Sequence, residues 1–223
     1  MNDPSHIPNK TIEQEAAKLV QTFEKESGIR IKPPIPVFEM IEFLGYDLDF
    51  RSDGFYEDPN NLGGLHIDEK LVVINETLSY QEGRMNFTAA HEIGHIKLHV
   101  PILMEQKARE NILCRKDEGF EGTKKDPKEW QADTFAAYLL MPTDRVTDAF
   151  NKVSQHPITL KKKRFLNLFM KTRPTRQRSL WIAENVINEG GFENVSKLAM
   201  ANRLIGLRFV RGIGYQKLLG VCK

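Results

Sequence analysis

Apolar positions at helical spacing mark the N-terminal part of the chain. Residues 11–26 repeat apolar side chains every three or four positions, and Thr11 with Gln14 forms the Thr-x-x-Gln pattern of a capping box. Residues 1–10 lack such a pattern, so we expect a flexible tail there. The Pro-Pro-Ile-Pro run at 33–36 should end the first helix, and a second helix is expected to follow it.

Apolar runs between residues 46 and 75 predict β-strands. Residues 46–50 alternate between apolar and polar, and residues 63–75 read as two strands on either side of an Asp-Glu-Lys turn. The second strand, Leu-Val-Val-Ile-Asn at 71–75, is our candidate for an edge strand that would pair with an extended substrate. A buried strand with no free edge is the equally open alternative.

Two further helices are predicted. One begins near Met85, and the other covers residues 129–142, where Pro142 ends it. The charge-rich connection 105–128 between them has no core pattern. We expect a solvated loop there, with a flexible flap as the alternative.

The first of these helices carries His-Glu-Ile-Gly-His at 91–95. On a helix, positions i and i+4 lie about 40° apart around the axis, so His91 and His95 project from one face, one turn apart. Two imidazoles in that arrangement can bind one Zn²⁺ ion. Glu92 is placed to reach a water molecule on that ion, which is the role of the general base in zinc hydrolases.

Catalytic zinc usually takes a third protein ligand, and the second helix offers one. Pro101 occupies the position where a metzincin would have its third histidine, so that arrangement is excluded. Glu129 can bind the ion instead, and Asp133, one turn later, can accept the N–H of a ligand histidine and fix its tautomer. Ordinary exposed carboxylates are the alternative.

Small side chains should let the two helices approach each other closely. Ala132 and Ala136 lie on the same side of their helix as Glu129, and Gly94 offers a small position on the facing helix.

His99 continues the histidine series one turn beyond His95. It could bind substrate or help to hold the site, but a structural role at the helix end is the stronger interpretation.

The chain resembles the ImmA/IrrE metallo-endopeptidases, a bacterial and phage group, in two specific stretches: NFTAAHEIGHIKLH at 86–99 and EWQADTFAAYLLMP at 129–142. The resemblance extends from about residue 12 to 210. It implies a gluzincin-type site with one zinc ion, held by the two histidines and Glu129, and with Glu92 as the base. It also implies a substrate, namely a helix-turn-helix repressor of stress or mobile-element genes.

Composition fits a cytoplasmic protein without a membrane partner. Of the 223 residues, 40% are hydrophobic and 28% are charged. The first residues lack the layout of a signal peptide, and the longest apolar run, FAAYLLM, is too short to span a membrane. Cys114 and Cys222 are far apart in the sequence and are interpreted as free thiols.

Charge is divided unevenly along the chain. Residues 1–140 hold 16 basic and 25 acidic side chains, a balance of −9, whereas residues 141–223 hold 16 basic and 5 acidic, a balance of +11. This asymmetry predicts an anionic partner for the C-terminal part, either an acidic protein surface or DNA. A solvated helix face is the alternative. The densest basic run consists of Lys161, Lys162, Lys163, Arg164, Lys171, Arg173, Arg176 and Arg178.

These features together predict an α+β fold. A flexible tail at 1–10 should precede a zincin-like metallopeptidase domain at 11–142, which holds a small β-sheet and the histidine-bearing helix. A basic helical region at 143–223 should follow, with a helix-turn-helix-like segment at 195–207. The predicted function is that of a zinc-dependent endopeptidase. Two alternatives remain: a zinc-binding regulator that binds DNA, and a component of a toxin–antitoxin or phage module that acts by binding without proteolysis.

Overall fold

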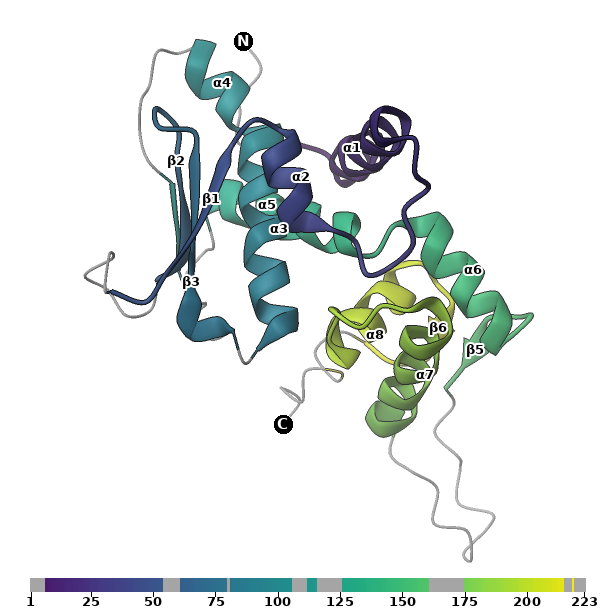
Figure 1. Ribbon diagram of the computed structural model, residues 1–223. Helices are drawn as coiled ribbons and strands as arrows, with labels where there is room; N and C mark the ends of the chain where they lie inside the picture. The colour runs from purple at the N-terminus through teal and green to yellow at the C-terminus, as the bar shows by residue number, and fades with distance from the viewer. Residues whose placement is uncertain are drawn as a thin grey trace, which may run out of the picture. The chain divides into compact units, whose positions relative to one another are not determined.

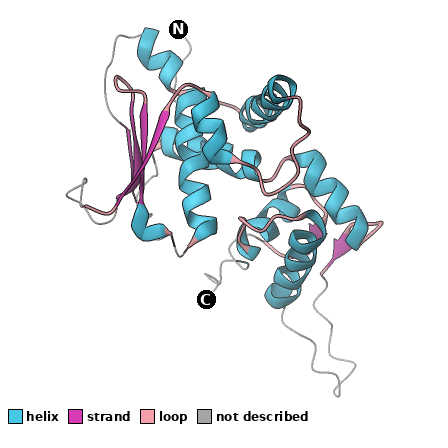
Figure 2. Ribbon diagram, in the orientation of Figure 1, coloured by secondary structure: helices cyan, strands magenta, loops and turns pink. Residues whose placement is uncertain are grey.

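The protein has the predicted α+β fold (Figures 1 and 2). The computed structural model describes residues 7–53, 61–79, 81–105, 112–115, 126–160, 175–214 and 218. The chain divides into two compact units, one formed by residues 1–31 and 35–140 and the other by residues 32–34 and 141–223.

The first unit combines helices with a mixed β-sheet. In chain order its elements are α1 (Asn9–Ser27), α2 (Val37–Phe43), β1 (Asp47–Arg51), β2 (Asn61–His66), β3 (Leu71–Asn75), the short 3-10 helix η1 (Glu76–Leu78), α3 (Glu82–Leu98), α4 (Val100–Glu105), β4 (Ile112–Arg115) and α5 (Pro127–Leu140).

The start of α1 differs from the prediction. The helix begins at Asn9, with Pro8 at the N-cap position and no capping side chain, so the capping box of Thr11 and Gln14 is wrong. The Thr11 N–H already donates to the Pro8 carbonyl at 2.9 Å, so the first turn closes through the backbone alone. Residues 9 and 10 therefore belong to the helix rather than to a tail.

The sheet has the strand order β1-β3-β2-β4. Strand β3 pairs with β1 in parallel and with β2 antiparallel, so Leu71–Asn75 lies inside the sheet and the predicted edge strand is wrong. Both sides of β3 are occupied by neighbouring strands, and no backbone edge is left for a substrate. The edges are β1 and β4. Strand β4 lies within the connection 105–128, so part of the predicted loop is a strand.

Helix α3 packs against the sheet and against α5. It begins at Glu82, three residues before the predicted start. The approach to the sheet is close because β2 has a glycine at the contact: a Cβ on Gly63 would lie 2.9 Å from the Thr88 methyl group and 2.8 Å from the Val73 carbonyl oxygen.

Helix α5 has clear signals at both ends. The Asp126 side chain accepts a hydrogen bond from the Lys128 N–H at 2.8 Å, and Pro127 occupies the first helical position, where no N–H is needed. Pro142 follows the last helical residue, Leu140, as predicted.

The second unit contains α6 (Thr143–Val153), β5 (Ile158–Thr159), α7 (Thr175–Gly190), α8 (Lys197–Gly206) and β6 (Val210–Arg211). Helix α7 packs on both α6 and α8, and the rings of Phe150 and Phe209 stack at 4.5 Å. The guanidinium of Arg203, on α8, donates to the Met141 carbonyl and to the Thr143 hydroxyl, which fixes the start of α6.

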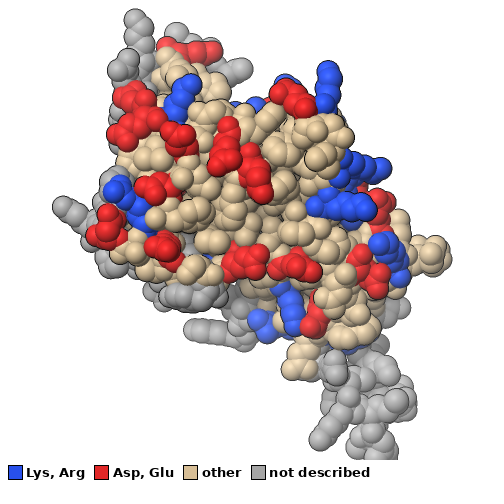
Figure 3. Space-filling model, viewed as in Figure 1, with Lys and Arg blue, Asp and Glu red and all other residues tan. Residues whose placement is uncertain are grey.

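No helix in the described part of the chain is long and apolar enough to cross a membrane. Figure 3 shows acidic side chains spread over the face on which the sheet and α2 lie, in keeping with the negative balance of the first 140 residues.

Candidate active site and metal centre

Three side chains from two helices converge in the first unit. The Nε2 atoms of His91 and His95 on α3 lie 3.0 Å apart. Glu129, in the first turn of α5, places one oxygen 3.2 Å from His91 Nε2 and the other 3.3 Å from His95 Nε2. The two histidine side chains are 3% and 1% exposed, whereas the Glu129 side chain is 28% exposed, so the cluster opens towards Glu129.

This arrangement fits a metal ion. Ligand atoms in each of these residues all lie within 4.8 Å of one another. Tetrahedral ligands that are each roughly 2.0–2.1 Å from a zinc ion are separated by about 3.3 Å, close to the observed spacings. Two imidazole nitrogens and one carboxylate form the ligand set of catalytic sites that keep a position open for water.

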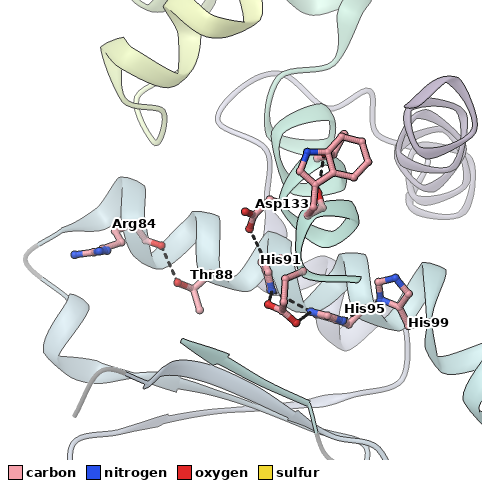
Figure 4. A network of polar contacts seen from close by, with 9 residues as sticks. Arg84, Thr88, His91, His95, His99 and Asp133 are labelled. Atoms are coloured by element: carbon pink, nitrogen blue, oxygen red, sulfur yellow. Dashed lines mark hydrogen bonds and ion pairs between the residues drawn. The ribbon is translucent and has the colours of Figure 1, made fainter. Parts of the chain in front are cut away.

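Asp133 fixes the orientation of the first histidine. Its Oδ1 lies 2.7 Å from His91 Nδ1. Figure 4 marks this contact with a dashed line, and because a carboxylate can only accept, Nδ1 donates the hydrogen. His91 Nε2 is then left without a hydrogen and has its lone pair free for a metal. The sequence placed Asp133 in this role, and its geometry here fits that role.

Glu92 is buried beside the cluster. It is fully enclosed, and neither carboxylate oxygen has a hydrogen-bond partner among the described residues. Burial raises the pKa of Glu92 to about 8, with the charge of His91 acting against this and that of Glu129 adding to it. A divalent cation nearby would favour the ionised form and lower that pKa. The unpartnered oxygens indicate that Glu92 requires a ligand, such as a water molecule on a metal, to complete its contacts.

The pKa values of Glu129, His95 and His99 also depart from their ordinary range. Burial alone would raise the pKa of Glu129, but the neighbouring imidazoles of His91 and His95 hold it well below its usual range. Burial lowers the pKa of His95, and it lowers that of His99 to about 4, so both rings favour the neutral form that binds metal.

Close helix packing makes the cluster possible. A Cβ on Gly94 would lie 3.0 Å from both the Cα and the carbonyl oxygen of Ala132, and Ala132 and Ala136 are fully buried. The predicted close approach of the two helices at these small residues is therefore what the structure has.

His99 and Gln131 extend the polar cluster beyond His95. His99 Nδ1 lies 2.9 Å from His95 Nδ1, and His99 Nε2 lies 3.0 Å from Gln131 Oε1. His99 thus faces the side of His95 opposite the converging ligand atoms. Gln131 was not among the residues predicted from the sequence, although a polar residue in the buried stripe shared with Phe135 and Leu139 was an available signal.

The family can be named from a direct comparison. The model of the family described as IrrE N-terminal-like domain, Peptidase_M78, matches residues 48–167, more than half of the chain. The chain belongs to this family. The matched part of this Peptidase_M78 protein includes α3 and α5, and with them every residue of the cluster. No curated protein matches the chain.

Of the predicted partner-binding residues, the structure describes Arg176 and Arg178. Lys161, Lys162, Lys163, Arg164, Lys171 and Arg173 lie outside the described residues. Arg176 donates to the Leu218 carbonyl at 2.7 Å, and Arg178 lines a hollow with Ile158, Trp181 and Ile182. Neither residue contributes to the metal cluster.

Proposed function

We propose that the protein is a zinc-dependent endopeptidase that cleaves a helix-turn-helix transcriptional repressor of a stress or mobile-element regulon. The observation that carries the peptidase part is the buried carboxylate of Glu92, which has no hydrogen-bond partner among the described residues and lies beside two histidines and Glu129. A structural zinc site normally uses four protein ligands and has no need for a free carboxylate there.

Each residue has a distinct part in the proposed hydrolysis. When bound, zinc supplies Lewis acidity, which activates a water molecule and polarises the scissile carbonyl. His91, His95 and Glu129 would hold the ion, and Asp133 keeps His91 in the tautomer that can bind it. Glu92 would accept a proton from the attacking water on a carboxylate oxygen and pass it to the leaving amine nitrogen.

The repressor is proposed from the family resemblance together with the charge of the C-terminal part. A balance of +11 in residues 141–223 suits a partner with an acidic surface or bound DNA. The rival candidate, a regulator that reads DNA through α7 and α8, is less well supported. The two helices are joined by residues 191–196, a longer connection than the three- or four-residue turn of a helix-turn-helix motif.

The test separates chemistry from metal binding. In Glu92→Gln the side chain keeps its shape but loses the base, so zinc content should persist while cleavage falls by roughly 100-fold or more. Cleavage of the repressor encoded beside this protein is measured by gel, with and without a chelator, and metal content by elemental analysis.

Glu82→Gln is the matched control, because Glu82 is an exposed carboxylate in the first turn of the same helix. It should cleave like the unaltered protein. Normal turnover by Glu92→Gln would refute the mechanism. Hydrolysis of a generic peptide, but not of the repressor, would leave the peptidase proposal standing and remove the proposed substrate.

A further inference from the structure

The two nitrogens of His95 face different surroundings. Its Nε2 points to His91 and Glu129, whereas its Nδ1 lies 2.9 Å from His99 Nδ1. His99 in turn places Nε2 3.0 Å from the side-chain oxygen of Gln131. His95, His99 and Gln131 are 0%, 2% and 1% exposed, so each proton in this row must be shared among the protein groups themselves.

The hydrogen-bonding capacity of these groups leaves one arrangement of protons. The amide oxygen of Gln131 only accepts, so His99 Nε2 carries a hydrogen. A neutral imidazole has one N–H, and His99 Nδ1 is therefore a bare acceptor. The contact between the two Nδ1 atoms needs one hydrogen, which must belong to His95. His95 Nε2 is then left with a free lone pair.

We infer that His99 and Gln131 are positioning residues that fix the metal-binding tautomer of His95. The inference rests on the proposed zinc site and deepens it. If the Gln131 amide were turned so that its nitrogen faced His99, every proton in the row would move. His95 Nε2 would then carry a hydrogen and could not bind an ion.

The two histidine ligands are thus held by different means. His91 donates to Asp133, a carboxylate, whereas His95 donates to a row of neutral groups that ends in an amide. In both cases the group that is hydrogen-bonded to the histidine sets its tautomer and its ring orientation, as is usual for histidines that bind a metal. His99 lies at the C-terminal end of α3, so the structural role predicted from the sequence is linked to the chemistry of the site.

Two variants of His99 test the inference. Asparagine and leucine have the same branched shape, but only asparagine offers an acceptor near the place of Nδ1. Zinc affinity is measured by competition with a chromophoric chelator. His99→Leu should bind zinc roughly 10–100-fold more weakly, whereas His99→Asn should retain most of the affinity.

Which of the two variants binds zinc more tightly distinguishes a positioning role of His99 from a packing role. In a buried apolar setting leucine packs better than asparagine, so a merely structural role would make His99→Leu the milder change, both in zinc affinity and in the melting temperature of the metal-free protein. Zinc affinity in His99→Leu equal to or above that in His99→Asn would overturn the inference.

Gln131→Met provides an independent measurement if the His99 variants do not fold. It keeps the length of the side chain and removes the acceptor, so zinc affinity should fall and the absorption spectrum of the cobalt-loaded protein should change. Unchanged affinity and spectrum would overturn the inference. Failure of the unaltered protein to bind zinc would instead refute the proposed function.

Discussion

Two carboxylates of the site have opposite acid–base properties. Glu129 lies beside two imidazoles, which keep its pKa low, whereas Glu92 is enclosed with no hydrogen-bond partner among the described residues and has a pKa of about 8 in the absence of metal. One group is therefore suited to bind a cation and the other to take up a proton. Pairs of groups whose surroundings separate their pKa values in this way are typical of acid–base catalysis.

The raised pKa of Glu92 predicts a pH-dependent stability for the metal-free protein. Between pH 4.5, the ordinary pKa, and about 8, the unfolded chain loses a proton that the folded chain keeps, so the free energy of unfolding falls as pH rises. A shift of this size corresponds to at most on the order of 5 kcal/mol. Glu92→Gln lacks this penalty.

Urea denaturation in the presence of a chelator measures the effect. The stability of Glu92→Gln relative to the unaltered protein should be greater at about pH 8 than at about pH 5. A difference that is the same at both pH values would mean that Glu92 is not held protonated by its surroundings.

At the scale of elements, the site depends on how closely α3 and α5 approach. In Gly94→Ala, the added methyl group would meet the Ala132 backbone at 3.0 Å, which has no flexible end that can move aside. The helices must separate by a few tenths of an ångström, at a cost of roughly 1–3 kcal/mol in stability. Zinc affinity should fall as well, because the ligands come from both helices.

Gly206→Ala is the control for this change. Gly206 lies at the end of α8, and a methyl group added there would have nothing within 4 Å, so its exchange for alanine should leave stability unchanged or raise it. Calorimetry of both variants checks the prediction. If Gly94→Ala is as stable as the original protein and binds zinc as tightly, the contact between the two helices at Gly94 and Ala132 has room for a methyl group.

The sequence predicted α3 and α5 well because both carry a helical pattern together with a chemical motif. The order of the strands in the sheet was harder to predict. Whether Leu71–Asn75 is an edge depends on β1, which pairs with it from more than twenty positions away, and an apolar run looks the same in either place. Strand β4 was not predicted because it is short and lies among charged residues.

The pairing of side chains was predictable where the needs of a zinc site supplied it, as for Asp133, or where it followed from spacing along one helix. His91 and His95 are of the second kind. Gln131 and His99 lie on different helices, and their contact follows from the depth to which α5 packs against the end of α3, which no single-helix pattern records.

At the scale of the whole molecule, residues 1–140, which include the candidate metal cluster, carry a net negative charge, and residues 141–223 carry a net positive charge. Replacing Lys161, Lys162, Lys163 and Arg164 by glutamate should leave zinc content intact, because the candidate ligands are His91, His95 and Glu129, while sharply reducing cleavage of the proposed repressor. Cleavage of a short uncharged peptide provides the control and should not change.

Salt dependence distinguishes the two possible counterparts of the basic run. Direct contact with DNA gives a log–log slope in affinity of about −0.9 per phosphate neutralised, whereas protein–protein attraction is shallower and acts mainly on the association rate. Undiminished cleavage of the repressor by the charge-reversed protein at physiological salt would mean that the basic run is only a solvated surface.

The uneven burial of the three candidate metal ligands has a consequence for how an ion would be exchanged. The histidine side chains are 3% and 1% exposed and belong to α3, which packs against both the sheet and α5, whereas the Glu129 side chain is 28% exposed and lies in the first turn of α5, a part of a helix that frays easily. A departing ion would lose its carboxylate ligand first. The lifetime of the loaded state is then governed by how often one helical turn opens, and metal can be exchanged while α3 and the sheet beneath it stay folded.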